Sequence, residues 1–167
     1  KWTSESALEL PMPVPNIDVA VMMREMSSLL EQRIEAGKLY HTNPDPVDIA
    51  KEDLENLLHD SLYFATIMSY AQGLAQITEA SEQLKMDVPV TEVVKVWRGG
   101  CIIRSALLDN FASAYQESPE LKNLLLDKNI ASILQSKLSA IQKVISLAAG
   151  NNYAVPGLMA AFCYFNA

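Results

Sequence analysis

Apolar residues recur along this chain at the three- and four-residue spacing of amphipathic helices, and the alternation typical of strands is nearly absent. The longest such pattern runs from about Ile49 to Leu84. A helix of that length exceeds the usual globular helix, so we expect it to cross a whole domain, with a kink near Gly73. The pattern predicts an all-α fold, and 167 residues fit one helical domain over positions 1–167.

Proline, glycine and capping residues divide the rest of the chain into shorter predicted helices. They are Thr3 to Leu10, Asn16 to Gly37, Thr91 to Gly100, a helix from there to Gln116, a short helix starting at Ser118-Pro119, one from Asp127 or Asn129 to Ala149, and one from Pro156. Between the first two, Pro11, Pro13 and Pro15 predict an extended connector.

A weak internal repeat relates the two ends of the chain. Val14-Pro15-Asn16-Ile17 matches Val155-Pro156-Gly157-Leu158, and an alanine follows each at the same spacing. A duplicated helix–proline turn–helix unit would explain the match, and so would chance similarity between short helices that start with proline.

Composition and charge narrow the classes of partner. The net charge of −7 argues against nucleic acid and anionic membrane surfaces. No charged residue occurs from Val144 to Ala167, but Gly150 to Asn152 and Pro156 divide this stretch into pieces too short for a membrane span. Cys101 and Cys163 lie in apolar stretches, which predicts reduced, buried thiols.

Both ends of the sequence look cut. The chain begins without an initiator Met or a signal-peptide pattern, and it stops directly after the apolar Phe162-Cys163-Tyr164-Phe165. We therefore expect a piece of a longer, cytoplasmic protein.

Arg24 is the candidate ligand-binding residue. It lies mid-helix beside apolar positions, and its neighbours three and four residues away are Ala20, Val21, Ser27 and Ser28, none of them acidic. A half-buried guanidinium without a local counterion needs a distant carboxylate or a bound anion such as phosphate. A tertiary salt bridge and a snorkelling surface arginine remain alternatives.

Other chemistry-bearing residues favour structural interpretations. Arg98 and Arg104 flank Gly99-Gly100 without phosphate-loop spacing, so we expect closely abutting helices whose arginines cap carbonyls or pair with acids. His41 and His59 belong to no metal-spaced cluster, so we expect surface or capping histidines and no metal site. The sequence contains no strand–GxGxxG–helix fingerprint and no nucleophile–His–acid set, so it predicts no catalytic and no cofactor-binding residue within the chain.

Four strings resemble the decarboxylating 6-phosphogluconate dehydrogenase family in order and spacing. They are Lys1-Trp2-Thr3 followed by Ser6-Ala7-Leu8-Glu9, then Ser69-Tyr70-Ala71-Gln72-Gly73, Trp97-Arg98-Gly99-Gly100-Cys101-Ile102-Ile103-Arg104-Ser105, and Pro119-Glu120-Leu121 leading to Asn123-Leu124-Leu125-Leu126. The resemblance implies the all-helical C-terminal domain of such an enzyme, with the fold duplicated. It places Arg24 on the arginine that binds the substrate phosphate.

The resemblance also implies what lies outside the chain. NADP would bind an upstream Rossmann domain. The lysine base and the glutamate acid that convert 6-phosphogluconate to ribulose 5-phosphate and CO2, in the pentose phosphate pathway and in gluconate utilization, would also lie upstream of Lys1. An arginine and a histidine from a C-terminal tail would serve the partner subunit of a homodimer. We therefore expect the isolated chain to be inactive.

Some strings depart from the family, so the sugar acid and the choice of NADP over NAD stay open. One departure is Phe165-Asn166-Ala167, where the family usually has Tyr-Asp-Gly. A non-enzymatic helical dimerisation domain, and the helical domain of another β-hydroxyacid dehydrogenase, are the alternative interpretations.

Overall fold

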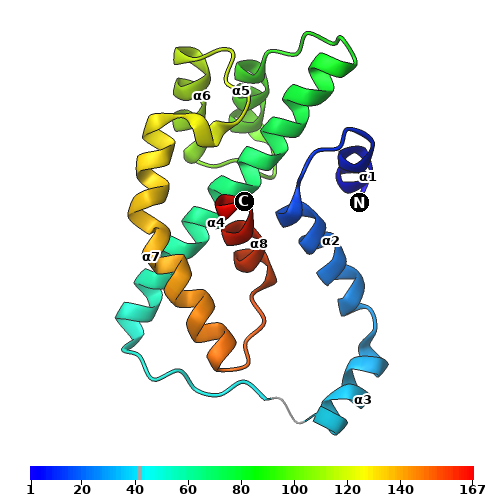
Figure 1. Ribbon diagram of the computed structural model, residues 1–167, viewed down its shortest axis with the longest axis vertical. Coiled ribbons are helices and arrows are strands. Elements are labelled where there is room, and N and C mark those ends of the chain that lie inside the picture. Colours follow the sequence, from blue (N-terminus) through cyan, green and yellow to red (C-terminus); the bar gives the residue numbers. More distant parts are fainter. Residues whose placement is uncertain (41–42) are drawn as a thin grey trace. The chain divides into compact units, whose positions relative to one another are not determined.

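The computed structural model describes residues 1–40 and 43–167, and these residues form helices and connecting loops with no strand (Figure 1). The predicted all-α fold is therefore confirmed for the part of the chain that is described. His41 lies outside the described residues. The elements are α1 (Trp2–Glu9), α2 (Pro15–Ser27), α3 (Leu30–Tyr40), α4 (Lys51–Gln83), α5 (Val90–Gly100), α6 (Leu107–Glu117), the 3₁₀ turn η1 (Leu124–Leu126), α7 (Lys128–Gly150) and α8 (Pro156–Asn166).

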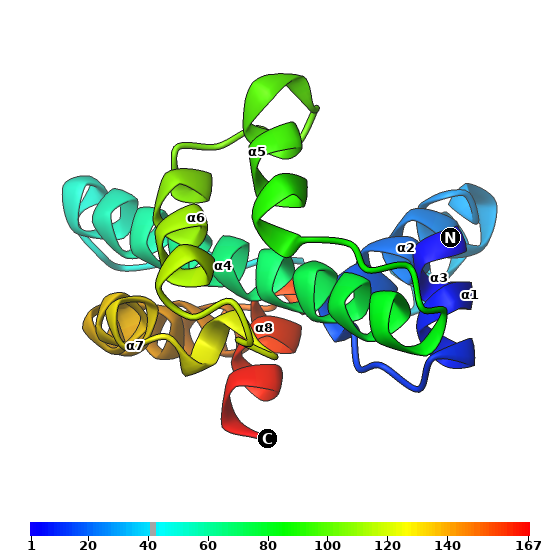
Figure 2. The same ribbon diagram turned by 90° about the horizontal axis from the view of Figure 1, so that it is seen from above.

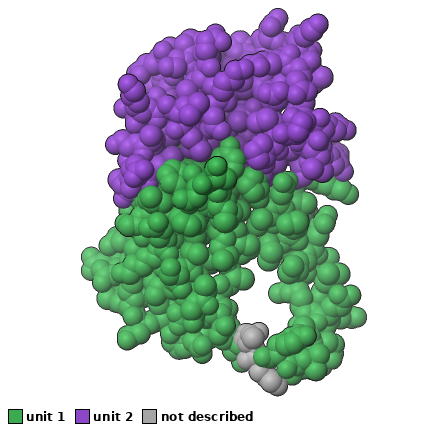
Figure 3. Space-filling view, viewed as in Figure 1, with its two compact units in different colours: residues 1, 15–68, 137–167 green, residues 2–14, 69–136 purple. Residues whose placement is uncertain are grey.

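The chain divides into two compact units (Figure 3). Unit 1 contains residue 1 and residues 15–68 and 137–167, and unit 2 contains residues 2–14 and 69–136. The long helices α4 and α7 each contribute residues to both units. Whether the chain behaves as one domain, as the sequence predicts, stays a prediction.

Unit 1 is built around a pair of helices that each start with proline. α2 packs against α8, and the Asn16 amide donates to the Gly157 carbonyl over 3.4 Å. Deeper in the unit, Phe64 of α4 meets Phe165 of α8 edge-on, with ring centroids 5.1 Å apart. The two segments of the internal repeat thus begin helices that lie against each other, a geometry that suits a duplicated unit.

Unit 2 centres on the aromatic side chain of Tyr70. Its ring lies 5.3 Å from that of Phe111 and 6.1 Å from that of Trp97, measured between centroids. α5 packs against α6, and the two can be seen side by side in both ribbon views (Figures 1 and 2). Fully buried side chains of this unit include ones from four helices and from η1: Leu74, Val94, Leu108, Phe111, Tyr115, Leu124, Ile130 and Leu134.

The predicted long helix is confirmed as α4, which runs unbroken from Lys51 to Gln83 through Gly73. Asp127, rather than Asn129, caps α7, because its Oδ1 accepts the backbone N–H groups of Asn129 and Ile130, each over 2.9 Å. No helix among the described residues has both the length and the apolar character that a membrane crossing needs.

The single helix predicted from Asn16 to Gly37 is wrong, because the chain breaks after Ser27. The Ser27 hydroxyl donates to the Arg24 carbonyl over 2.6 Å, and the Ser28 hydroxyl donates to the Glu25 carbonyl over 2.7 Å. Serine side chains that bind the preceding turn compete with the backbone for those carbonyls. The helix therefore ends there, and α3 starts anew at Leu30.

Two other predicted helix starts are also wrong. The segment 101–106 is a turn, so the helix after Gly100 begins only at Leu107. The Ser118-Pro119 helix is absent: this segment is a turn, followed by η1, whose first turn is capped by the Asn123 side chain accepting from Leu125 N–H over 2.9 Å.

The cysteines are free but not buried. Cys101 is half-buried and Cys163 is exposed, although each lies in an apolar stretch. An apolar stretch at the end of a helix does not identify which of its faces is covered, and the covered positions near Cys163 are Ala160 and Ala161.

Candidate functional site

Arg24 occupies the last turn of α2 in unit 1. Its side chain is exposed, not half-buried as the apolar neighbours suggested. Ala20, four residues earlier on the same face of the helix, is exposed as well. No ion pair joins its guanidinium to a carboxylate of residues 1–40 or 43–167. The internal carboxylate that would have given Arg24 a purely structural role is therefore not observed in this part of the chain.

The backbone beside Arg24 is held by polar side chains. Besides the two serine hydroxyls that end α2, Arg33 of α3 donates from Nη1 to the Ser27 carbonyl over 3.5 Å. A guanidinium is always charged and presents a planar fork of N–H donors, which matches the oxygens of a phosphate or carboxylate. The end of α2 thus presents an arginine that makes no ion pair within residues 1–40 and 43–167, and the backbone beside it has defined hydrogen bonds.

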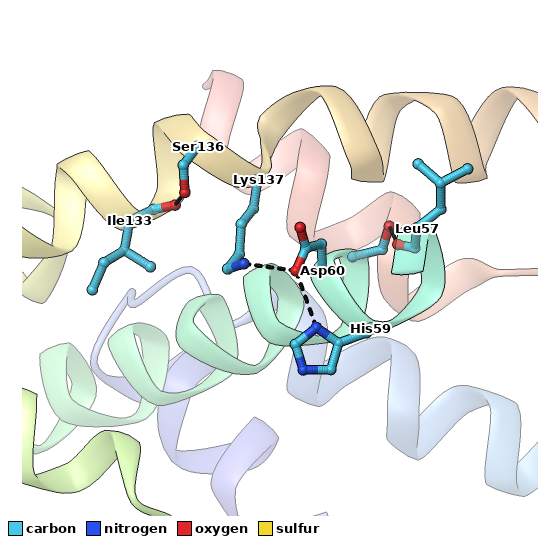
Figure 4. A network of polar contacts seen from close by, with 7 residues as sticks. Leu57, His59, Asp60, Ile133, Ser136 and Lys137 are labelled. Atoms are coloured by element: carbon cyan, nitrogen blue, oxygen red, sulfur yellow. Dashed lines mark hydrogen bonds and ion pairs between the residues drawn. The ribbon is translucent and has the colours of Figure 1, made fainter. Parts of the chain in front are cut away.

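A polar network in unit 1 links α4 and α7 (Figure 4). The Lys137 ammonium lies 2.6 Å from Asp60 Oδ1 and 4.9 Å from the centroid of the Tyr63 ring, while His59 Nδ1 lies 3.0 Å from the same carboxylate oxygen. Hydrogen bonding by Lys137, and secondarily by His59, lowers the pKa of the Asp60 carboxyl below its ordinary value. These residues satisfy one another, so we assign the network to helix packing.

Sequence reasoning missed this network because Asp60 and Lys137 lie 77 positions apart on separate helices. His59 is exposed, which confirms its prediction as a surface histidine. The only signal of this network in the sequence was that His59 and Asp60 are adjacent, and a histidine next to an aspartate is too common to indicate a polar network.

The Arg-Gly-Gly-Cys string joins α5 to the turn at 101–106 in unit 2. Arg98 Nε lies 3.0 Å from Asp109 Oδ1, which confirms the predicted pairing of Arg98 with an acid. The Tyr70 hydroxyl donates to the Ile103 carbonyl, and burial raises the pKa of this phenol. Ile102, on the same turn, is 100% exposed.

The predicted close approach of helices at Gly99 and Gly100 is wrong. A Cβ built at either glycine would meet nothing within 4 Å, and neither glycine has a positive φ. Nothing in the described residues explains why glycine stands at these two positions.

No group of three or more His, Cys, Asp and Glu side chains among the described residues could hold a metal ion. Because residues 1–40 and 43–167 form no strand, they do not build the strand–loop–helix unit that holds a dinucleotide.

The described residues are helical or in loops, with a pair of helices that start with proline and an exposed arginine, and this architecture defines the class as an all-helical domain. The family model of the 6-phosphogluconate dehydrogenase C-terminal domain matches residues 1–167. The chain belongs to this family.

Named relatives agree with that assignment. The NADP(+)-dependent, decarboxylating 6-phosphogluconate dehydrogenase of Bacillus subtilis is 41% identical over 167 residues, which cover 99% of this chain and 36% of that protein. The decarboxylating 6-phosphogluconate dehydrogenases of Lactococcus lactis (strain IL1403) and of Spinacia oleracea are 37% and 34% identical, each over 99% of this chain and 35% of its own length.

A solved structure is similar as well. Plasmodium falciparum 6-phosphogluconate dehydrogenase, described in its apo form, with its cofactor NADP+ and with its substrate 6-phosphogluconate, superposes with a TM-score of 0.92 at 32% identity. The match covers 99% of this chain and 36% of that one. The chain therefore spans a little over a third of the length of the relatives it matches.

Proposed function

We propose that this chain is the substrate-binding and dimerisation domain of an NADP-dependent dehydrogenase that converts 6-phosphogluconate to ribulose 5-phosphate and CO2. The observation that carries the proposal is the family match over residues 1–167. The B. subtilis relative, whose name states NADP dependence and decarboxylation, supports the reaction class.

Arg24 is the residue that we propose for substrate binding. It is exposed, and no ion pair with a carboxylate of the described residues occupies it, so the guanidinium is available for a phosphate. A bidentate, charge-assisted pair of hydrogen bonds to a phosphate contributes roughly 2–3 kcal/mol, even on a chain whose net charge repels anions.

The cofactor belongs to another part of the protein in this proposal. The described residues do not fit a dinucleotide, so we place NADP, which accepts the hydride from the sugar acid, on a dinucleotide-binding domain outside this chain. The chain's own contribution is to bind and orient the phosphate end of the substrate. By this proposal the isolated chain has no dehydrogenase activity.

The partner that we propose is a second copy of the protein. α2 and α3 carry large apolar side chains that are about half exposed or more: Met22, Met26, Leu30, Ile34, Leu39 and Tyr40. Exposed apolar surface on neighbouring helices is typical of an interface. A cytoplasmic location is part of the same proposal and rests on the family resemblance.

The test uses the complete gene product and a matched pair of arginine variants. Arg24→Met should raise KM for 6-phosphogluconate by roughly 30-fold or more, the loss of about 2–3 kcal/mol. Arg104→Met removes the same charge from an exposed arginine with no ion pair among the described residues, and should leave KM unchanged.

Two results would contradict the proposal. Failure of the complete protein to turn over 6-phosphogluconate with NADP would favour a non-enzymatic helical domain. Equal KM values for Arg24→Met and the unmodified enzyme would remove Arg24 from the site. Light scattering of the complete protein tests the homodimer separately.

A further inference from the structure

All four carbonyls at the C-terminal end of α2 have hydrogen-bond donors, and Arg33 supplies the last. The last four carbonyls of a helix lack partners within it. Here Ser27 Oγ donates to the Arg24 carbonyl, Ser28 N–H and Oγ donate to Glu25, Leu29 N–H donates to Met26 over 3.1 Å, and Arg33 Nη1 donates to Ser27 over 3.5 Å.

This capped turn is the turn that carries Arg24. The direction of a long side chain follows from the backbone to which it is attached, and a helix end without partners frays. α3, which supplies Arg33, has no buried residue, so hydrophobic packing within the described part of the chain contributes little to holding this corner of unit 1 together. Polar contacts at the corner therefore matter more than they would inside a packed core.

We propose that Arg33 is a positioning residue for Arg24: by capping α2, it keeps the phosphate-binding guanidinium in one orientation. The inference rests on the proposed role of Arg24 in substrate binding. A cation at a helix C-terminus interacts favourably with the carbonyls and with the helix dipole. When the cap is lost, the substrate has to order the frayed turn as it binds, and the cost appears as weaker binding.

The predicted signature is a change in KM without a change in kcat. The phosphate end of the substrate does not react, so its contacts are equally strong in the ground state and in the transition state. In the complete enzyme, Arg33→Met should raise KM for 6-phosphogluconate about threefold, the size expected for loss of one helix-end charge, and leave kcat unchanged.

Two variants and one control separate positioning from general effects of charge. Arg33→Lys keeps a cation that can reach the Ser27 carbonyl and should restore KM to within about twofold of the unmodified value. Ser27→Ala removes the bond to the Arg24 carbonyl and should raise KM in the same direction as Arg33→Met. Arg104→Met, which changes net charge equally in unit 2, should change nothing.

The double variant Arg24→Met/Arg33→Met decides the mechanism. If Arg33 acts through Arg24, the second substitution adds no further increase in KM to that of Arg24→Met alone. An additive increase would mean that Arg33 contacts the substrate itself. An unchanged KM in Arg33→Met would mean that Arg33 neither positions Arg24 nor contacts the substrate. Both results overturn the inference while leaving the proposed function intact. An unchanged KM in Arg24→Met instead removes the proposed substrate site.

Discussion

The ammonium of Lys137 lies 2.6 Å from the carboxylate of Asp60, and this ion pair joins α7 to α4 within unit 1. Lys137 is 18% exposed and also lies over the Tyr63 ring, so its charge is partly shielded from water. The Asp60 side chain is 36% exposed, and solvent therefore screens part of the attraction.

Replacing Asp60 by asparagine should lower the free energy of unfolding at pH 7 by about 0.5–1 kcal/mol, since the pair is half-exposed. Urea unfolding measures this loss. Asp48→Asn is the control, because Asp48 is exposed and has no ion pair among the described residues. Equal stability of Asp60→Asn and the unmodified protein would show that the pair contributes nothing measurable.

The same pair predicts how stability depends on pH. The folded pKa of Asp60 is lowered from the ordinary value of 3.8, first by Lys137 and then by His59. A lowered carboxyl pKa contributes stability that is present above the unfolded pKa and is lost as the pH falls through the folded pKa. The difference between the protein and Asp60→Asn in urea should therefore shrink as the pH falls below about 4.

Removing the Tyr115 hydroxyl should not destabilise unit 2. This phenol is 1% exposed, and its oxygen has no hydrogen-bond partner among the described residues. Because an unsatisfied buried hydroxyl is costly, Tyr115→Phe should unfold at equal or higher urea, with a gain of up to about 1 kcal/mol. Tyr70→Phe is the matched comparison: it loses the bond to the Ile103 carbonyl and should cost about 1 kcal/mol.

Tyr115 should also titrate late. Burial raises its pKa to about 12. Since the unfolded phenol ionises near 10, the stability that neutral Tyr115 contributes is present below that pH and is lost as the pH rises toward 12. Because Tyr115 should still be neutral near pH 11, the folded protein and Tyr115→Phe should show the same phenolate absorbance at that pH. A normal titration curve would contradict the burial of this group.

The cap of α7 offers a separate test. Asp127 Oδ1 accepts two backbone N–H groups, so Asp127→Ala should cost about 1 kcal/mol in the free energy of unfolding. Asn129, the other capping candidate in the sequence, lies inside the helix, and Asn129→Ala should cost nothing. If the two costs were reversed, the start of α7 would be misplaced.

Gly99→Ala should stabilise α5, because a Cβ there meets nothing and alanine favours the helix by roughly 0.5–1 kcal/mol. Thermal unfolding and steady-state turnover of the complete protein should be measured together. Unchanged turnover is expected if no partner approaches this glycine. Higher stability accompanied by lower activity would reveal that a segment outside this chain packs against it.

Much of this fold could be predicted from helical periodicity and capping residues. α4 was recognisable because apolar spacing persists over its length without a proline, and α8 because Pro156 suits the first position of a helix. The break after Ser27 was not recognisable. It arises because two serine hydroxyls donate to carbonyls of the preceding turn, and the sequence does not reveal whether a serine will make such a bond.

The site was predictable only in part. Arg24 stood out because no acid lies three or four residues away on its helix face, and the structure leaves it without an ion pair in the described residues. Its exposure was misjudged, because apolar neighbours imply burial only when something packs on that face. Ile17, Val21 and Met23 are half-buried, whereas Met22 and Met26 are exposed.

The break that isolates α3 has a consequence for its dynamics. An eleven-residue helix without a buried residue is too short to persist by itself in water. Its backbone amides should therefore exchange with deuterium within seconds wherever nothing shields them, and far more slowly once another surface does. The exchange rate from Leu30 to Tyr40 would thus measure the proposed assembly of two copies without substrate or cofactor.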